Sequence, residues 1–118
     1  MKFVSFNSRS GDFVGLATSR DAQALRMVLG PGGESEDKPR NEHRHSEQWM
    51  FVMEGTGRAT VGKTKKATRT VRLKPGSLLL IEKGEMHRIA NTGRRRLVTL
   101  NFYIPPAYDK RGHPKEPT

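Results

Sequence analysis

The sequence predicts an all-β barrel of short antiparallel strands folded as one domain. Glycine and proline interrupt the chain at short intervals, with 12 Gly and 7 Pro among 118 residues. The segments between them are short and rich in β-branched and aromatic residues. None of them shows the 3.6-residue period of an amphipathic helix. This combination is typical of a β sandwich or barrel.

The expected strands follow one another along most of the chain. They are Lys2–Phe6, Ala24–Leu29, Gln48–Met53, Arg58–Val61, Thr68–Leu73, Leu78–Ile81, His87–Ala90 and Leu97–Tyr103. The fourth and fifth flank a lysine-rich turn and are expected to form a hairpin. Leu78–Ile81 is a continuous apolar run, typical of a strand buried on both faces. Glu34–Asn41 is polar and predicts a loop, and Ser19–Arg26 has room for one helical turn.

The length of the chain is that of a single domain. We expect the barrel to occupy residues 1–107 and a polar, mobile tail to occupy residues 108–118. Cysteine is absent, which excludes disulfides, thiolate ligands and a cysteine nucleophile. No apolar run approaches the ~20 residues that cross a bilayer, and the N-terminus lacks the apolar stretch of a signal peptide. We therefore expect a soluble, cytoplasmic protein with no membrane partner.

The formal net charge is +10, which raises the question of a nucleic-acid partner. No acidic residue occurs from Gly55 to Ile81, and Arg94–Arg96 adds a second basic run. We interpret both as solvated turns, because lysine at strand edges also opposes aggregation. Stacking aromatics do not alternate with these charges, and no helix-turn-helix or zinc-finger pattern is present. We do not expect nucleic acid to be the main partner; high charge also favours solubility or steers anionic substrates.

The histidines provide the most specific signal. His43 and His45 are two residues apart, so on a strand both would point to one face, where two imidazoles can share a metal ion. An isolated pair of this kind is more often an exposed polar pair. The two stretches that follow it, residues 48–57 and 76–91, change that interpretation.

These stretches resemble the two motifs of the cupin superfamily. The first motif reads G-x5-H-x-H-x3,4-E-x6-G, and it is matched by His43, His45 and the closing Gly55. The glutamate position, counted back from that glycine, falls on Gln48, one residue closer to His45 than in the family. The resemblance runs from about Leu25 to Pro106.

The second motif reads G-x5-P-x-G-x2-H-x3-N. It is matched at every spacing by Gly76, Gly84, His87 and Asn91, with Glu82 in place of the proline. Asn91 precedes a Thr-Gly pair, which favours a role in the turn over metal ligation. His113, the fourth histidine of the chain, lies in the expected tail and is interpreted as solvated.

The resemblance implies a double-stranded β-helix, the jelly-roll barrel of the cupins. It also implies a metal site formed by His43, His45, Gln48 and His87 near one mouth of the barrel. Glu47 competes with Gln48 as the oxygen ligand. Neutral imidazoles with an amide oxygen suit Fe, Mn, Ni or Zn as the divalent transition metal, and they leave its full charge uncompensated.

Strand parity extends these expectations. If Gln48 points inward, so do Met50 and Val52, whereas Trp49 and its alternate neighbours form a second apolar face. That face needs a cover, either a second copy in a homodimer or an N-terminal strand from residues 1–30. Met50 and Phe102 are candidate substrate-binding residues, with ordinary core packing as the alternative for each.

The function expected from the resemblance is metal-dependent action on a small organic molecule in the barrel. Small cupins of this kind include dioxygenases, isomerases and decarboxylases or lyases. The alternatives are a non-catalytic module that binds a sugar or small effector, and a basic nucleic-acid-associated protein. The sequence assigns no catalytic residue, because no second ionisable group is clearly placed as a general base.

Overall fold

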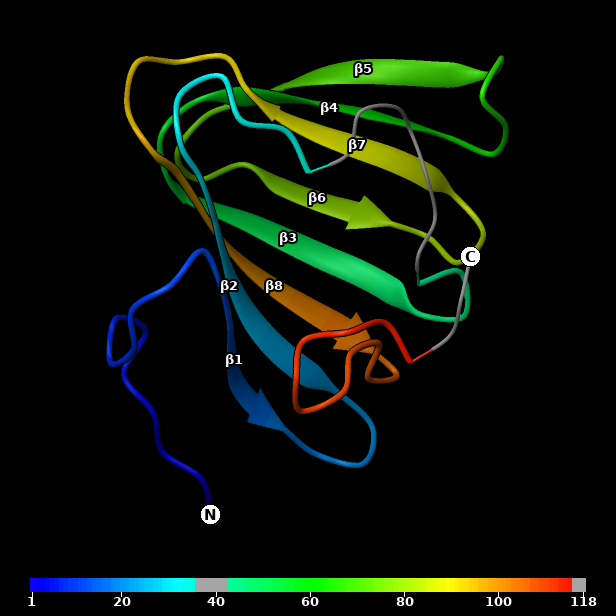
Figure 1. Ribbon diagram of the computed structural model, residues 1–118. Coiled ribbons are helices and arrows are strands. Elements are labelled where there is room, and N and C mark those ends of the chain that lie inside the picture. Colours follow the sequence, from blue (N-terminus) through cyan, green and yellow to red (C-terminus); the bar gives the residue numbers. More distant parts are fainter. Residues whose placement is uncertain (36–42, 116–118) are drawn as a thin grey trace.

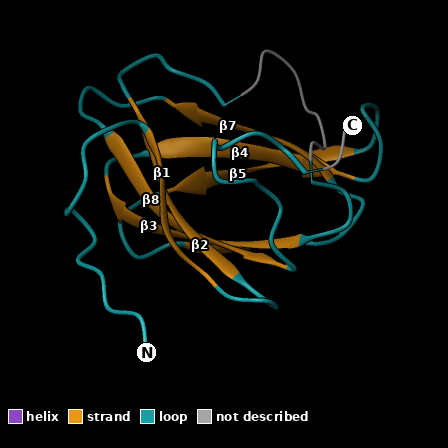
Figure 2. Cartoon of the chain, turned by 60° about the horizontal axis from the view of Figure 1, so that its bottom comes forward, coloured by secondary structure: helices purple, strands orange, loops and turns teal. Residues whose placement is uncertain are grey.

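The computed structural model describes residues 1–35 and 43–115, and within them every regular element is a β-strand. The strands are β1 (Phe13–Thr18), β2 (Gln23–Leu29), β3 (Glu47–Glu54), β4 (Gly57–Gly62), β5 (Thr68–Leu73), β6 (Leu78–Ile81), β7 (Met86–Asn91) and β8 (Leu97–Ile104). They form two antiparallel sheets, with strand orders β1-β2-β8-β3-β6 and β5-β4-β7. Figures 1 and 2 show the two sheets facing each other. The predicted all-β jelly roll is confirmed.

Alternation along the strands determines what lies between the sheets. Along β3, Gln48, Met50 and Val52 are buried, whereas Phe51 and Met53 are exposed. The predicted parity of this strand is therefore correct. Met50 and Val52 join a core cluster of buried apolar side chains from both sheets. That cluster consists of Met50, Val52, Ala59, Leu73, Ile89 and Leu97.

The β4–β5 hairpin also forms as predicted, with Gly57 opposite Leu73 and Gly62 opposite Thr68. The strand expected at Leu78–Ile81 forms as β6, but the prediction that both its faces are buried is wrong. Leu78 is 61% exposed and Leu80 is 37% exposed. The reason is its position: β6 is an edge strand that pairs with β3 alone, and its outer side chains extend the apolar outer face of the five-stranded sheet.

The N-terminal prediction needs correction as well. Residues 2–6 form no strand; β1 begins at Phe13 and pairs with β2. The preceding segment instead lies across the outer side of β2, where the Arg26 guanidinium donates to the backbone carbonyls of Phe6 and Gly11. The helical turn expected near Ser19 is replaced by a tight turn, in which the Ser19 hydroxyl accepts hydrogen bonds from the next backbone amides. β2 then starts at once.

Gly55, the closing glycine of the first motif, has a clear structural reason. Its φ is +88°, in the left-handed region that favours glycine. A Cβ there would lie 2.2 Å from the carbonyl oxygen of Arg96. This glycine therefore lets the β3–β4 turn pack directly on the β7–β8 turn.

The segment after β8 is more ordered than its composition suggests. The Ala107 and Tyr108 amides both donate to the Gln23 side-chain oxygen, and Tyr108 is buried beside Leu25 and Tyr103. The Lys115 amide donates to the carbonyl of Ala107, which closes the loop. The polar segment predicted to start at residue 108 thus begins with a core residue. No helix long and apolar enough to cross a membrane occurs in the described ranges.

Candidate metal centre

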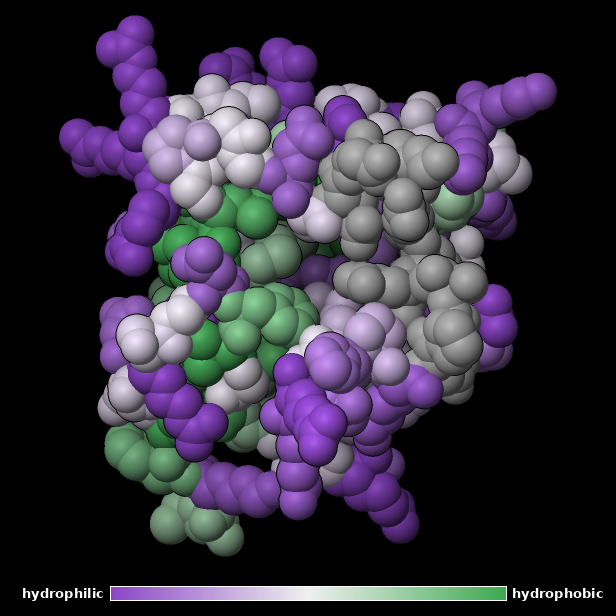
Figure 3. Space-filling model, viewed as in Figure 1, coloured by the Kyte–Doolittle hydropathy of each residue, from purple (hydrophilic) through white to green (hydrophobic). Residues whose placement is uncertain are grey.

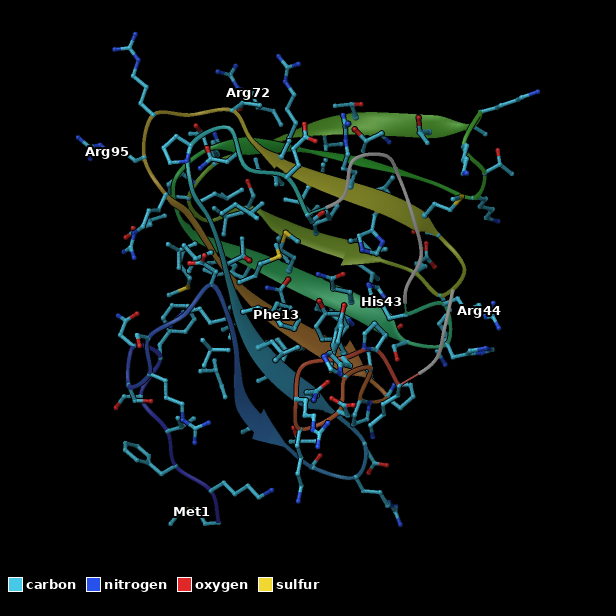
Figure 4. The ribbon with its side chains drawn as sticks, in the orientation of Figure 1. Met1, Phe13, His43, Arg44, Arg72 and Arg95 are labelled. Carbon is cyan, nitrogen blue, oxygen red and sulfur yellow. The ribbon has the colours of Figure 1, made fainter. Side chains whose placement is uncertain are left out.

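Two of the four proposed ligands meet inside the barrel. His87 lies on β7 and points inward, and His43 lies in the turn that leads into β3. Their Nε2 atoms are 3.1 Å apart, and the two side chains are only 7% and 4% exposed. Figure 4 shows His43 directed toward the interior, whereas its neighbour Arg44 points away from the barrel. The fold therefore joins residues that are 44 positions apart in the sequence.

Local contacts hold His43 in this position. The turn is closed by a hydrogen bond from the Ser46 amide to the His43 carbonyl oxygen. The Ser46 hydroxyl donates to the carbonyl oxygen of Pro105, at the end of β8. The His43 ring also packs edge-on against Tyr103, with centroids 4.9 Å apart.

The protonation state of His87 suits a metal ligand. Burial, followed by the charge of His43, lowers the pKa of the His87 imidazole from 6.5 to about 3. The ring is therefore neutral at physiological pH, and neutral imidazole is the form that binds transition metals. The backbone of Glu85 acts on this ring in the opposite direction and raises its pKa, but burial and His43 outweigh that effect.

The distance between the two nitrogens passes a simple geometric test. Two nitrogens that each lie ~2.1 Å from one ion are about 3.0–3.4 Å apart over the range of angles from octahedral to tetrahedral sites. The Nε2–Nε2 separation of 3.1 Å lies within this range. Without an ion, the same pair can share one proton in an N–H···N hydrogen bond.

Gln48 contributes a buried oxygen to the same region. Its Nε2 donates to Asn101 Oδ1, Asn101 Nδ2 donates to the Thr99 hydroxyl, and that hydroxyl donates to a backbone carbonyl of β2. This relay fixes the orientation of the amide. The Gln48 Oε1 atom is left buried with no hydrogen-bond partner. Because an unsatisfied buried acceptor costs about 1–3 kcal/mol, the oxygen is suited to a cation or a donor from a ligand.

The remaining predicted ligands, His45 and the competing Glu47, lie elsewhere. His45 is exposed, and its Nε2 accepts a hydrogen bond from Arg44 Nε at 3.2 Å. Glu47 points to the outer face, where it accepts a hydrogen bond from the Trp49 indole. Among the described residues, no group of three or more His, Cys, Asp or Glu is arranged to hold a metal. The structure thus brings together His43 and His87, with Gln48 beside the same interior space, but not His45 or Glu47.

A cavity of about 410 Å³ opens beside this group, within the usual size range of small-molecule sites. It lies between the two sheets, and Figure 3 shows hydrophobic residues gathered to the left of the centre of this face. The described lining contains carboxylates but no Lys or Arg. It consists of Asp12, Phe13, Met27, Val28, Leu29, Gly30, Gly33, Glu34, Ser35, Gln48, His87, Ile89, Tyr103 and Tyr108.

The two predicted substrate-binding residues lie outside this lining. Met50 is fully buried in the apolar core. Phe102 is 39% exposed on the outer face, because its neighbours Asn101 and Tyr103 take the inward positions of β8. The aromatic residues that do line the cavity are Phe13, Tyr103 and Tyr108, which stack edge-to-face at centroid distances of 5.0 Å.

Asn91 serves the turn rather than the site. Its side-chain amide donates to the carbonyls of Leu29 and Arg95, and its oxygen accepts from the Gly93 amide. Asn101 and Thr99 were missed by the sequence reasoning. Their alternation on β8 could have indicated them, because a buried polar side chain needs a hydrogen-bond partner inside the barrel.

Comparison with known proteins agrees with this fold. A family model described as "Cupin domain" matches residues 25–103. The Bacillus halodurans protein BH2720 is 23% identical, with a TM-score of 0.80 over 98% of this chain and 88% of that chain. KdgF from Halomonas sp. is 16% identical, with a TM-score of 0.76 over 90% and 94%. A Lactobacillus farciminis oxalate decarboxylase is 24% identical, with a TM-score of 0.65 over 76% and 26%. These structural likenesses show the fold alone, and a search of the curated proteins found no match.

Proposed function

The chain belongs to the cupin domain family, and from this premise we propose that it holds a divalent transition metal and acts on, or binds, a small organic molecule in the adjoining cavity. The observation that carries the proposal is the buried pair of facing Nε2 atoms on His43 and His87, 3.1 Å apart. Gln48 supplies the third donor through its unpartnered oxygen. Iron, manganese, nickel and zinc all suit such a donor set.

When bound, the ion supplies Lewis-acid polarisation of an oxygen on the small molecule. All three donors are neutral, so they do not offset the charge of the ion. The relay from Gln48 through Asn101 to Thr99 keeps the amide oxygen aimed inward. Its role is to position the ligand oxygen, as outer hydrogen bonds do at metal sites in general.

We include His45 in the ligand set of the loaded site. It follows His43 by two residues, and its exposed side chain has room to turn. Its contribution to affinity should be smaller than that of His87, because its imidazole must first leave its contact with Arg44.

The cavity lining suggests which molecules enter. Phe13, Tyr103 and Tyr108 give it an aromatic wall, which favours a compact molecule with a flat or apolar portion. Tyr103 also touches the His43 ring, so a molecule on that wall lies beside the proposed metal.

A binding module without turnover is the second candidate function. The described carboxylates in the lining are Asp12 and Glu34, and both are exposed. The described lining therefore offers no buried carboxylate as a general base, and its other ionisable side chains are those of His87, Tyr103 and Tyr108. Turnover with a panel of keto acids, catechols and sugar derivatives separates the two functions.

Metal analysis of the purified protein tests the proposal. We expect about one transition-metal ion per chain by elemental analysis, and loss of that ion in His87→Ala. His113→Ala is the matched control, since His113 is exposed, and it should retain the ion. Stoichiometric metal in His87→Ala would refute the proposed site.

We also propose that the chain forms a homodimer through the outer face of the five-stranded sheet. The N-terminal segment covers this face over β2 but leaves a large apolar area on β3, β6 and β8, where exposed patches often mark interfaces. The exposed residues there are Phe51, Met53, Leu78, Leu80, Phe102 and Ile104. Phe51→Glu places a charge in the centre of this patch, and Lys110→Glu is an exposed control away from it. Light scattering should find a monomer in the first and a dimer in the second; a dimer in both contradicts the proposal.

A further inference from the structure

The outer face of the three-stranded sheet carries an unusual distribution of charge. β4, β5 and β7 contain no Asp or Glu in any of their positions. Arg58 on β4 lies directly opposite Arg72 on β5, and both side chains are exposed. Thr60 lies opposite Thr70 in the same register, with their hydroxyls 3.2 Å apart, and Arg88 lies on the other side of Thr60. We name these five residues the arginine face.

The turns at both ends of the sheet extend this charge. Arg94, Arg95 and Arg96 follow β7 at the end of the sheet where Gly57 pairs with Asn91. The lysine turn, residues 63–66, lies at the opposite end, beyond Gly62. Figure 3 shows hydrophilic side chains extending from the upper margin of the molecule, above β4 and β5, and Figure 4 shows Arg72 and Arg95 pointing away from the barrel. The sheet and these flanks hold half of the 22 Lys and Arg in the chain: Arg58, Lys63, Lys65, Lys66, Arg69, Arg72, Lys74, Arg88, Arg94, Arg95 and Arg96.

Few acidic groups oppose this charge among the described residues. Glu34 lies 3.9 Å from Arg88, and Glu54 lies 3.3 Å from Arg96. Glu82 and Glu85 lie in the turn that leads into β7. No ion pair to Arg58 or Arg72 is found in the part of the chain that the structure describes.

Two like charges directly opposite each other on a sheet are destabilising. Solubility requires net charge, but it does not require two arginines in cross-strand register. An anion that contacts both guanidinium groups removes the repulsion, since each can bind phosphate through two parallel hydrogen bonds. The threonine pair next to them adds hydroxyl donors of the kind that contact phosphate and sugar.

We propose that the arginine face binds the phosphate backbone of double-stranded nucleic acid, independently of base sequence. The basic turns at both ends extend the charge of this face over the full length of β4, whose six residues at ~3.3 Å each span about 20 Å, the length of about six base pairs at ~3.4 Å. A charge distribution of this length suits a polymer better than a small anion. The outward residues of the three strands include no aromatic side chain, so the platform that stacks unpaired bases is missing, which favours a duplex over a single strand.

This surface is separate from the proposed metal centre, because the side chains of the arginine face point outward and His87 points inward. It is also separate from the proposed dimer patch, which lies on the other sheet. Nucleic-acid binding should therefore leave both undisturbed.

Binding of a fluorescent 20-base-pair duplex of arbitrary sequence, measured by anisotropy from 0.05 to 0.3 M salt, tests the proposal. The variant is Arg58→Gln/Arg72→Gln. Its matched control is Lys110→Gln/Arg111→Gln, which removes the same charge from an exposed loop elsewhere. Thermal melting verifies that each variant is folded.

The arginine variant should lower the slope of log K against log salt by about 1.8, because each phosphate contact contributes about 0.9. If those contacts contribute nothing at 1 M salt, the loss at 0.1 M is about 60-fold. The control should stay near wild type, and so should His87→Ala. Equal losses in the two double variants, or an unchanged salt slope in the arginine variant, would refute the proposal. Equal affinity for the single strand or for heparin at the same salt would refute the assignment to duplex.

Discussion

The buried histidine pair should make the metal-free protein sensitive to acid. In the folded chain the pKa of His87 is lowered to about 3 by burial and by the neighbouring His43. In the unfolded chain the imidazole returns to its ordinary value near 6.5. Between these two values the unfolded state binds a proton that the folded state does not. Stability is therefore fully present above pH 6.5 and is lost progressively as the pH falls toward 3.

The magnitude follows from the size of the shift. Each pH unit between the two pKa values lowers the free energy of unfolding by about 1.4 kcal/mol. The expected loss is about 2.7 kcal/mol at pH 4.5 and approaches 5 kcal/mol near pH 3. Small domains are stable by only ~5–15 kcal/mol, so this one group accounts for a large part of the total.

Urea unfolding of chelator-treated protein between pH 4 and 8 measures this loss. His87→Gln removes the ionisable group and keeps a polar side chain, so its stability should fall less steeply below pH 6.5 than that of the wild type. His45→Gln is the control, because the imidazole it removes is exposed, and it should follow the wild-type curve. Parallel curves for wild type and His87→Gln would refute the reasoning.

Three further predictions concern packing and ligation. Gly55→Ala should lower the free energy of unfolding in urea by more than ~3 kcal/mol, because the added Cβ would clash with a backbone carbonyl. Gly76 has a similar positive φ but open space around it, so Gly76→Ala should cost about 1–3 kcal/mol. Equal losses in the two variants would contradict this. Asn101→Leu removes the acceptor of the Gln48 amide and should cost about 1–3 kcal/mol, measured in the same way; an unchanged midpoint would argue against the relay. His45→Ala should weaken metal binding by at least about 10-fold in competition with a chelator, which is the lower limit even for groups that only orient a ligand, and unchanged affinity would exclude it as a ligand.

The sequence predicted the strands well where the inward and outward residues of a strand differ in character. β3 has an inward row that begins with a polar residue and an outward row that is mostly apolar, so its parity follows from the sequence alone. β6 shows the limit of the same reasoning. A run of four apolar residues is compatible with burial on both faces and with one buried and one exposed face, and only its place at the sheet edge distinguishes them. The N-terminal error has a similar origin, because the N-terminal segment is held by the side chain of Arg26, which contacts Phe6 and Gly11 and which no local pattern reveals.

Only part of the candidate site could be predicted, because the motif spacing identifies residues along the chain but not the direction of their side chains. Motif spacing identified His43 and His87, which the fold brings together. It did not predict that His45 would point outward, because its loop follows no strand period. Phe102 was predicted to bind substrate because it lies near the end of the last strand. The parity of β8 instead assigns the inward positions to Asn101 and Tyr103.

The interior of the barrel divides into two chemically different halves, and this division explains why the site lies where it does. Toward the β7–β8 turn, Val52, Leu97 and their neighbours form an apolar core. Toward the other end, the inward positions of the same strands change to Gln48 on β3 and Asn101 on β8. Buried polar groups are costly unless they are satisfied, so a stretch of the interior that holds two histidines and two amides, with one amide oxygen unpartnered, lowers stability unless something binds there. The same strands thus provide stability at one end and a place for ligation at the other.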